Sequence, residues 1–254
     1  MGPLSRQPLL PRYDIFEDLP DDMYIFVDKD SSGSGGPDTM PCNWLQTHEN
    51  AVDPFHVFVL HSTFSTAQFG ELMTIRPDIS WETTENGMIA IQKRKLPDGM
   101  TMRRVVEMVF PLARIVPDPT LRYTGRTNNV AWTLPVDDTN TRIFMAVAIR
   151  KGRPGPRFNH APIYNGRTWF ELDEEGHRRC PGDYEAQVGQ GAITFHSEEH
   201  LVTSDRGVTM YRRMFRQGIT SVREGGDPLN VPGPGDGRFR VRAGNYRIET
   251  ASAA

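Results

Sequence analysis

Stretches that alternate between apolar and polar residues lie mainly in the first 150 residues of the chain. Alternation, or a high content of β-branched and aromatic residues, predicts strands. It marks residues 23–28, 88–93, 101–110, 129–135 and 141–150. Apolar residues recur instead at three- and four-residue spacing in residues 43–60 and 197–217, which predicts two helices.

The second predicted helix has one apolar and one basic face. The positions expected to be buried are Leu201, Val208, Met210, Tyr211 and Met214. The positions expected to stay in water are Arg206, Arg212, Arg213 and Arg216. Such a division is typical of a helix that packs one face on a core.

Clusters of Gly and Pro mark residues 31–38, 151–157 and 231–237 as surface loops, and the small polar residues 249–254 are expected to fray. The chain contains neither an internal repeat nor a sharp change of composition. The pattern therefore favours a single α+β domain with a mostly antiparallel sheet.

Composition excludes several classes of function. The 254 residues carry a formal net charge of -3, so no basic surplus indicates a nucleic acid or an anionic membrane as partner. The chain has neither a secretory signal pattern nor an apolar run of about 18 residues, so a soluble, cytoplasmic protein is expected. Its two cysteines, Cys42 and Cys180, are too few for a disulfide framework or a Cys-ligated cluster and are expected to be reduced thiols.

The most informative segment is residues 43–61, which contains two histidines, His56 and His61, five residues apart. On an ideal α-helix, positions five apart are separated by about 140°, so both rings reach one metal only if the helix is distorted. A zinc protease is disfavoured, because its histidines are four residues apart and a Glu lies between them.

Residues 43–61 follow the pattern N-W-x4-E-N-x2-D-x2-H-x4-H, which resembles the iron-binding segment of Rieske non-haem iron oxygenase α subunits. The phthalate dioxygenase and dehydrodivanillate O-demethylase type is the most similar. Residues 135–141, 181–187 and 199–206 resemble further family segments in the same order. The resemblance covers most of the chain, and the fold it implies is a helix-grip fold, a curved antiparallel sheet around a long helix.

The resemblance assigns roles to individual residues. It implies that His56, His61 and Asp183 hold a mononuclear Fe(II) as a two-His-one-carboxylate triad. Asp53 matches the acid that connects a ligand histidine to the Rieske cluster of a neighbouring subunit, and Asn43 matches a residue near the iron in several relatives.

Each of these roles has a structural alternative. Asp183 follows Pro181-Gly182 and fits a turn, with Glu185 as the second-choice carboxylate. Asp53 precedes Pro54 and fits a helix cap, and a capping role suits Asn43 equally. The run Asp137-Asp138-Thr139 resembles a metal-binding acid pair, but a structural turn is the preferred interpretation. Residues 203–205 are expected at a turn or helix start.

Family members usually carry a Rieske domain with two Cys-x-His pairs before the iron segment. Residues 1–42 contain no histidine and no cysteine but Cys42. They are interpreted as a connector and first strand region packed on the iron domain, residues 43–254. A [2Fe-2S] centre is therefore expected on a partner chain, with a truncated gene or a binding role as alternatives.

The function implied by the resemblance is O2-dependent hydroxylation or O- or N-demethylation of an aromatic compound. The implied partners are a Rieske protein or ferredoxin and a reductase, in a homotrimer or hetero-oligomer. The rival hypothesis is a helix-grip module that binds a small hydrophobic ligand without chemistry. Candidate pocket residues are Phe55, Phe58, Phe64, Phe69 and Trp81. Candidate arginines for recognising a carboxylate are Arg142, Arg150 and Arg167.

Overall fold

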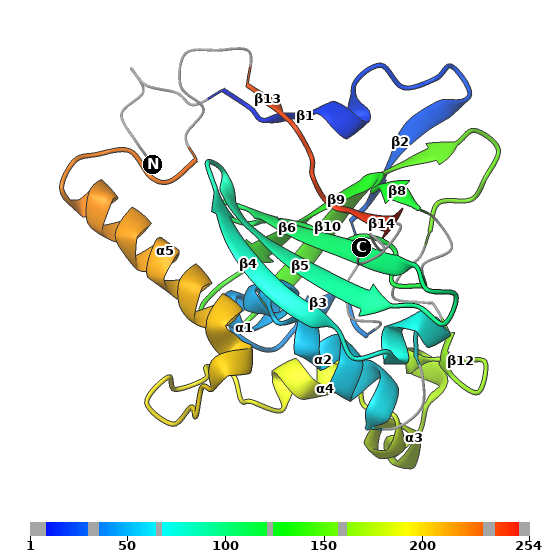
Figure 1. The fold of residues 1–254 in the computed structure, drawn as a ribbon. Helices are drawn as coiled ribbons and strands as arrows, with labels where there is room; N and C mark the ends of the chain where they lie inside the picture. The colour runs from blue at the N-terminus through cyan, green and yellow to red at the C-terminus, as the bar shows by residue number, and fades with distance from the viewer. Residues whose placement is uncertain are drawn as a thin grey trace, which may run out of the picture.

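The structure, a computed structural model, describes residues 9–29, 36–64, 68–120, 124–156, 162–230 and 237–248. A strongly curved sheet lies above a layer of short helices, and one long helix crosses its open side (Figure 1). The long helix is α5 (Arg206–Arg223), and the short ones are α1 (Trp44–Glu49), α2 (Pro54–Phe58), α3 (Glu174–Arg179) and α4 (Asp183–Val188).

Within the described residues the main sheet has ten strands and is antiparallel throughout, as expected. Its path runs β2-β10-β9-β7-β6-β14-β8, with β3 paired to β10 and β5 joining β4 to β6. The strands are β2 (Met23–Asp28), β3 (Thr39–Met40), β4 (Asp78–Thr84), β5 (Gly87–Lys95), β6 (Thr101–Val109), β7 (Ala113–Ile115), β8 (Gly125–Arg126), β9 (Asn129–Pro135), β10 (Thr141–Arg150) and β14 (Gly244–Ile248).

Two small pairs complete the strands. β1 (Arg12–Tyr13) runs parallel to β13 (Arg238–Phe239), and β11 (Pro162–Tyr164) pairs with β12 (Arg167–Thr168). Short 3-10 turns are η2 (Asp14–Phe16), η3 (Asn50–Val52), η5 (Glu71–Thr74), η7 (Trp169–Glu171) and η8 (Thr203–Asp205). A π-helical turn, η4 (Val59–Thr63), follows α2 directly.

All five predicted strands are present, and β2, β9 and β10 have the predicted bounds. The patterned stretches lie in the first 150 residues, but the sheet also contains the later strand β14, which pairs with both β6 and β8. Its sequence, Gly-Asn-Tyr-Arg-Ile, lacks the apolar alternation that marks the others. β14 is held by its two neighbours, which sequence pattern does not report.

The predicted helix 197–217 begins later than expected, at Arg206. Val208 and Tyr211 are buried as predicted, but Leu201 lies before the helix and is exposed. The prediction for Arg212 is also wrong, since it is buried between Glu49 and Glu199 and forms hydrogen bonds of 2.5–2.9 Å with both. The 3-10 turn η8 confirms the helix start expected at residues 203–205.

The two faces of the sheet bury different parts of the chain. Met88 and Met108 face α5, where they pack with Tyr211, Val208 and Val52. The opposite face packs against both ends of the chain, because Tyr13, Phe239 and Val241 cluster with Ile115 and Val130. A sheet covered on both faces explains why strands such as β5 are buried almost continuously.

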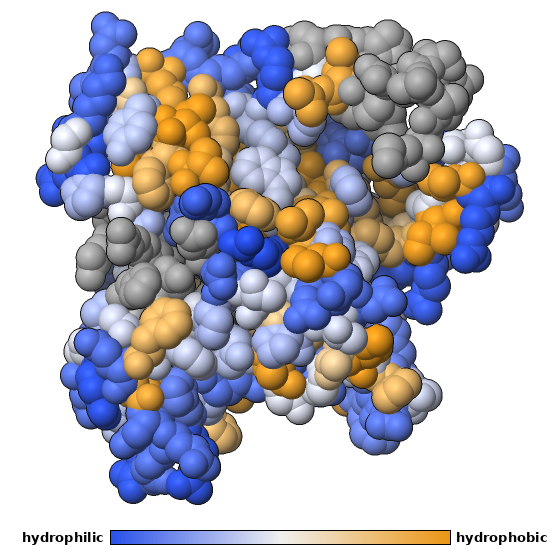
Figure 2. Space-filling model, turned by 180° about the vertical axis from the view of Figure 1, so that it is seen from behind, coloured by the Kyte–Doolittle hydropathy of each residue, from blue (hydrophilic) through white to orange (hydrophobic). Residues whose placement is uncertain are grey.

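Only some of the predicted loops lie within the described residues and can be compared with the structure. Residues 151–156 form a turn and irregular chain, as expected. Residues 30–35, 231–236 and 249–254, which carry most of the other loop predictions and the predicted frayed end, lie outside the described residues. Seen from behind, apolar side chains gather over β2, where Ile25 and Val27 are exposed (Figure 2).

Candidate metal centre

The His56–His61 segment contains the helix distortion that the spacing requires. α2 gives way to η4 after Phe58, and the N–H of Phe64 donates to the carbonyl of Val59, five residues back, at 2.9 Å. Hydrogen bonds over five residues widen the turn, so side chains five apart come to one face. The two imidazole rings accordingly lie with centroids 5.4 Å apart.

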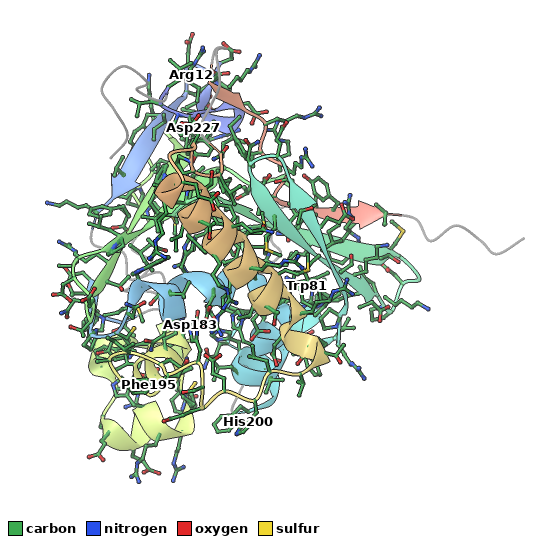
Figure 3. The ribbon with its side chains drawn as sticks, turned by 90° about the vertical axis from the view of Figure 1, so that its left-hand side faces the viewer. Arg12, Trp81, Asp183, Phe195, His200 and Asp227 are labelled. Carbon is green, nitrogen blue, oxygen red and sulfur yellow. The ribbon has the colours of Figure 1, made fainter. Side chains whose placement is uncertain are left out.

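Asp183 reaches this pair from a distant part of the chain. It is the first residue of α4, and Figure 3 places it where the α1 region meets the α3–α4 segment. Its Oδ1 lies 3.0 Å from Nε2 of His61 and 3.7 Å from Nε2 of His56. One ligand atom from each of the three residues lies within 4.8 Å of the other two. The structure therefore brings together the three residues predicted as metal ligands.

The histidines present the correct nitrogen to this point. Nδ1 of His56 contacts the backbone carbonyl of Asp53, and Nδ1 of His61 lies 2.7 Å from Oε1 of Gln68. A carbonyl or amide oxygen only accepts, so each Nδ1 carries a proton, and Nε2 is the nitrogen that each ring would offer to a metal. On His61 this Nε2 lies 3.0 Å from Oδ1 of Asp183. The amide of Gln68 is fixed in turn, because its Nε2 donates to Pro181 O at 3.0 Å.

Electrostatics keep Asp183 ionised. Burial alone would raise its pKa, but His61, His56 and Arg114 more than offset this, so the pKa of Asp183 lies well below its usual range. Burial would lower the pKa of His61, but Asp183 reverses this and the pKa is raised. His61 is buried, whereas His56 and Asp183 keep about a sixth of their side chains exposed, 17% and 15%. The site is shielded but not closed.

Two imidazoles, which would be neutral when bound to a metal, and one ionised carboxylate fit a first-row divalent metal. Each donor atom points at a shared space, and each imidazole has a hydrogen-bond partner on its far side, as metal-ligating histidines usually do. Three protein ligands on one side leave other coordination positions open. The chemistry of this donor set therefore matches the mononuclear Fe(II) expected from sequence.

The other predicted site residues take structural positions. The carboxylate of Asp53 caps α2 by accepting from Phe55 N at 3.0 Å, and it is the backbone carbonyl of Asp53 that contacts His56. Asn43 caps α1 through Leu45 N and donates to Asp138 O at 2.8 Å. Capping is thus the observed contact for both side chains, and their catalytic roles stay predictions.

The remaining acids serve turns and helix starts. Glu185, the second-choice carboxylate, accepts from Gly182 N, Trp169 Nε1 and His177 Nδ1 at 2.7–2.9 Å, so it organises the start of α4. Asp137 accepts from Thr139 N and Asn140 Nδ2. The structural interpretation of the Asp137-Asp138-Thr139 turn is confirmed.

The predicted pocket residues divide in the same way. Phe69 lies over His61 with ring centroids 4.5 Å apart, whereas Trp81 belongs to the core and donates to Val52 O at 2.9 Å. Phe64 is largely exposed. Phe55 and Phe58 lie on α2, half-buried.

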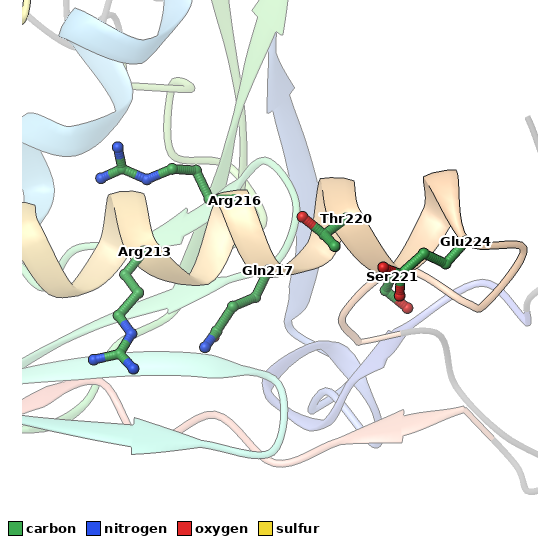
Figure 4. A pocket seen from close by; sticks show the side chains of 6 residues that line it. All are labelled: Arg213, Arg216, Gln217, Thr220, Ser221 and Glu224. Carbon is green, nitrogen blue, oxygen red and sulfur yellow. The ribbon is translucent and has the colours of Figure 1, made fainter.

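None of the three candidate arginines lies at the triad. Arg142 pairs with Asp38 at 3.0 Å, Arg150 lies 3.6 Å from Asp22, and Arg167 is exposed on β12. A hollow of about 460 Å³ is also remote from the triad (Figure 4). It lies on α5 and is lined by Arg213, Arg216, Gln217, Thr220, Ser221 and Glu224.

Sequence reasoning missed Gln68 and Arg114. Gln68 follows the iron segment without any motif of its own, and Arg114 lies in β7, 69 positions before Asp183. Only the folded chain brings them to the site, Gln68 by bonding His61 and Arg114 through its charge on Asp183.

Comparison with known proteins identifies relatives over nearly the whole chain. The chain is 41% identical over 269 residues to the phenoxybenzoate dioxygenase subunit alpha of Ectopseudomonas oleovorans, covering 99% of this chain and 63% of that protein. The chain belongs to the Rieske-type oxygenase subunits. Membership of this family implies a mononuclear iron in the catalytic domain.

Further oxygenase subunits are more distant. The tert-butanol monooxygenase / tert-amyl alcohol desaturase oxygenase subunit of Aquincola tertiaricarbonis is 31% identical, over 95% of this chain and 54% of that protein. The 5,5'-dehydrodivanillate O-demethylase oxygenase subunit of Sphingobium is 26% identical, over 76% and 45%. The chain spans less than two thirds of the length of these oxygenase subunits, and no family model matches it.

Solved structures agree on the fold. NdmB of Pseudomonas putida CBB5 superposes with a TM-score of 0.51 at 15% identity, over 85% of this chain and 55% of that one. NdmA with caffeine, from the same organism, gives 0.50 at 14% identity, over 85% and 57%. These structural neighbours confirm the helix-grip fold expected from sequence.

Proposed function

We propose that this chain is the iron-dependent catalytic part of a Rieske-type oxygenase, which hydroxylates or O- or N-demethylates an aromatic compound at the expense of O2. The observation that carries the proposal is the convergence of His56, His61 and Asp183. It occurs in a chain aligned over 99% of its length with an oxygenase subunit. Two histidines and one carboxylate on one side of the metal are the set used by non-haem Fe(II) oxygenases.

Iron, when bound, would supply the redox chemistry with dioxygen, and the protein supplies ligands, orientation and exclusion of water. His56 and His61 would offer their Nε2 atoms, and the ionised Asp183 would offset part of the metal charge. Asp53 O and Gln68 Oε1 hold the rings in place. Phe69 covers one face of His61 and keeps bulk water from that side.

Electrons are proposed to arrive from a Rieske [2Fe-2S] centre on another chain, served by a reductase. The Asp53 surface is the proposed docking point, because Asp53 is partly exposed and its carbonyl contacts Nδ1 of His56. A homotrimer or hetero-oligomer would bring such a centre close. An aromatic substrate is favoured by the phenoxybenzoate named for the 41% identical relative, and the more distant tert-butanol enzyme makes substrate trials necessary.

Metal content tests the proposal first. The chain is purified, loaded anaerobically with Fe(II), desalted, and its iron measured against protein. We expect about one iron per chain in the wild type and in His200→Ala, which removes an exposed histidine outside the triad. His56→Ala and Asp183→Ala should retain little. Full iron retention by both triad variants would contradict the assignment.

Oxygen uptake tests the reaction. The iron-loaded chain is combined with a Rieske ferredoxin, a reductase and 3-phenoxybenzoate, and oxygen consumption is compared with product formed. Uptake coupled to product supports the oxygenase. An iron-free chain that still binds aromatic ligands would instead support the non-catalytic binding module.

A further inference from the structure

Four polar side chains form a row on the helix-facing surface of the sheet. Gln92 and Arg94 lie on β5, Arg104 on β6 and Asn245 on β14. Arg104 is the register partner of both Gln92 and Asn245, and cross-strand partners share a face. Met88 lies four residues before Gln92 and six before Arg94, and because side chains alternate along a strand, all three lie on the same face of β5. Met88 packs with the core residues of α5. The row therefore lies inside the fold, and no member is more than 2% exposed.

The two guanidinium groups of this row are not fully used. Arg94 donates to Ile75 O at 3.0 Å and Gln92 Oε1 at 2.9 Å, but its Nη2 has no partner. Arg104 donates to Pro117 O at 2.7 Å and to Asp118 O and Asn245 Oδ1 at 3.0 Å. Its Nε has no partner. Each buried guanidinium thus keeps one nitrogen without a hydrogen-bond partner.

Arg94 and Arg104 also form no direct hydrogen bond to a carboxylate among the described residues. Every acceptor that they contact among the described residues is a neutral carbonyl or amide. Burial lowers the pKa of Arg94 to about 10. Burial together with Arg94 lowers the pKa of Arg104 to about 9, although the charge of Asp118 acts in the opposite direction. Both groups still carry a charge at neutral pH. Arg212, by contrast, is held by two carboxylates.

A buried guanidinium without a carboxylate partner is unfavourable, so two neighbouring ones favour the binding of an anion. Guanidinium groups bind carboxylates strongly, through two parallel hydrogen bonds where the geometry allows. Apolar surroundings strengthen such a contact, because little water competes for the donors.

The row adjoins the candidate metal centre through one short segment. Phe69 contacts the ring of His61. The next element, η5, packs against α2 and η4. Ile75, directly after η5, accepts a hydrogen bond from Arg94 through its backbone carbonyl. Thr120, next to the segment that Arg104 holds, lies against Gly70. In Figure 1 the strands β4, β5 and β6 lie above α2.

We propose that Arg94 and Arg104 bind the carboxylate of an organic acid and thereby hold the substrate between the sheet and the metal centre. The interpretation of the bound acid as a substrate rests on the proposed oxygenase function. The binding experiment that tests the site does not depend on that function. It narrows the substrate class to acids whose carboxylate lies some distance from the carbon that reacts.

Binding of simple probes to the full chain tests the proposal. Benzoate is compared with its neutral isostere benzamide and with inorganic phosphate by isothermal titration calorimetry, with and without metal. The metal-free measurement excludes direct coordination of benzoate. We expect benzoate to bind at least tenfold more tightly than either of the other two probes.

Gln92→Glu provides the decisive variant. It places an internal carboxylate where Gln92 Oε1 already accepts from Arg94, so it should neutralise the guanidinium without disturbing the packing. We expect an unfolding temperature at or above that of the wild type, with benzoate binding weakened at least tenfold. Arg94→Met should weaken it likewise, and Arg213→Met, on the exposed side of α5, should not.

The outcomes separate this proposal from the oxygenase assignment. Equal binding of benzoate and benzamide, equal binding of phosphate, or unchanged benzoate binding in folded Gln92→Glu overturns the carboxylate site. Iron content, which Gln92→Glu should leave unchanged, reports on the oxygenase assignment alone.

Discussion

Single residues outside the triad decide how its ligands point. Gln68 has an acceptor toward His61 and donors toward Cys180 Sγ and Pro181 O. Gln68 therefore links His61 to the segment that immediately precedes Asp183. Groups that orient a ligand in this way commonly contribute a factor of 10 to 100 to metal affinity.

Replacing Gln68 should weaken metal binding without removing a ligand. Gln68→Ala frees the His61 ring to rotate and to change tautomer, so Fe(II) or Co(II) affinity should fall by about tenfold to a hundredfold. Competition with a chelator measures this, and Gln217→Ala on α5 is the control. Unchanged affinity in Gln68→Ala would show that the ring is held by packing alone.

His48 is a buried histidine that stays neutral. Its Nδ1 lies 2.8 Å from Thr133 Oγ1 and its Nε2 lies 2.7 Å from Tyr211 OH. Burial, with help from Arg114, lowers its pKa to about 3. Below about pH 6.5 the imidazole of His48 therefore binds a proton in the unfolded chain but not in the folded chain.

The free energy of unfolding should therefore fall with acid. The loss expected from His48 is about 1.4 kcal/mol per pH unit below about pH 6.5, levelling near the folded pKa. Urea unfolding of metal-free protein between pH 8 and 5 measures the slope. His48→Gln should show a smaller slope and His200→Ala the wild-type one. Equal slopes in wild type and His48→Gln would mean that folded His48 takes up the proton.

At the scale of elements, the iron segment works because a helix start and a helix distortion follow each other closely. Asp53 caps α2 and Pro54 occupies its first turn, a position that suits proline. η4 then opens the turn before His61. Cap and π-helical turn together set which way both imidazoles face.

Two substitutions separate the capping role of Asp53 from a role of its charge. Asn caps helices about as well as Asp, and Ala does not. Asp53→Ala should lower the free energy of unfolding by about 1 kcal/mol, whereas Asp53→Asn should keep both stability and iron. Turnover with a Rieske partner should fall in both if the carboxylate serves electron transfer. Full turnover in Asp53→Asn would leave capping as its whole role.

At the scale of the whole molecule, the metal centre joins parts of the chain that are far apart in sequence. α2 and η4 carry the two histidines, and α4 brings the carboxylate from 122 positions beyond His61. A metal bound to the folded chain but not to the unfolded one stabilises the fold by mass action.

Fe(II) should consequently raise the unfolding free energy. At a free concentration of about 100 times the dissociation constant the gain is about 2.7 kcal/mol, measurable as a higher unfolding temperature under anaerobic conditions. Asp183→Asn should abolish the gain, and Mg²⁺, which prefers oxygen ligands, should give little in the wild type. Equal stabilisation of Asp183→Asn by Fe(II) would show that the metal binds at another site.

The sequence alone determined whatever depends on neighbouring residues. Alternation predicted β2, β9 and β10, and the five-residue histidine spacing required a distorted helix. Asp53 before Pro54 indicated a helix cap, but the single helix predicted over residues 43–60 is divided into α1, η3, α2 and η4. These features follow from local sterics and hydrogen bonding. The family pattern added Asp183, which local chemistry could not separate from a turn residue.

The tertiary structure decided the rest. The pairing of β14, the burial of Arg212 between two glutamates and the burial of Arg94 and Arg104 without a hydrogen-bonded carboxylate among the described residues all depend on strand register and packing. Which groups share a buried space is set by contacts between separate elements, some of them more than a hundred residues apart, such as Arg212 with Glu49 and Arg104 with Asn245. No pattern within a short window reports such contacts, because the energy that selects them belongs to the assembled core.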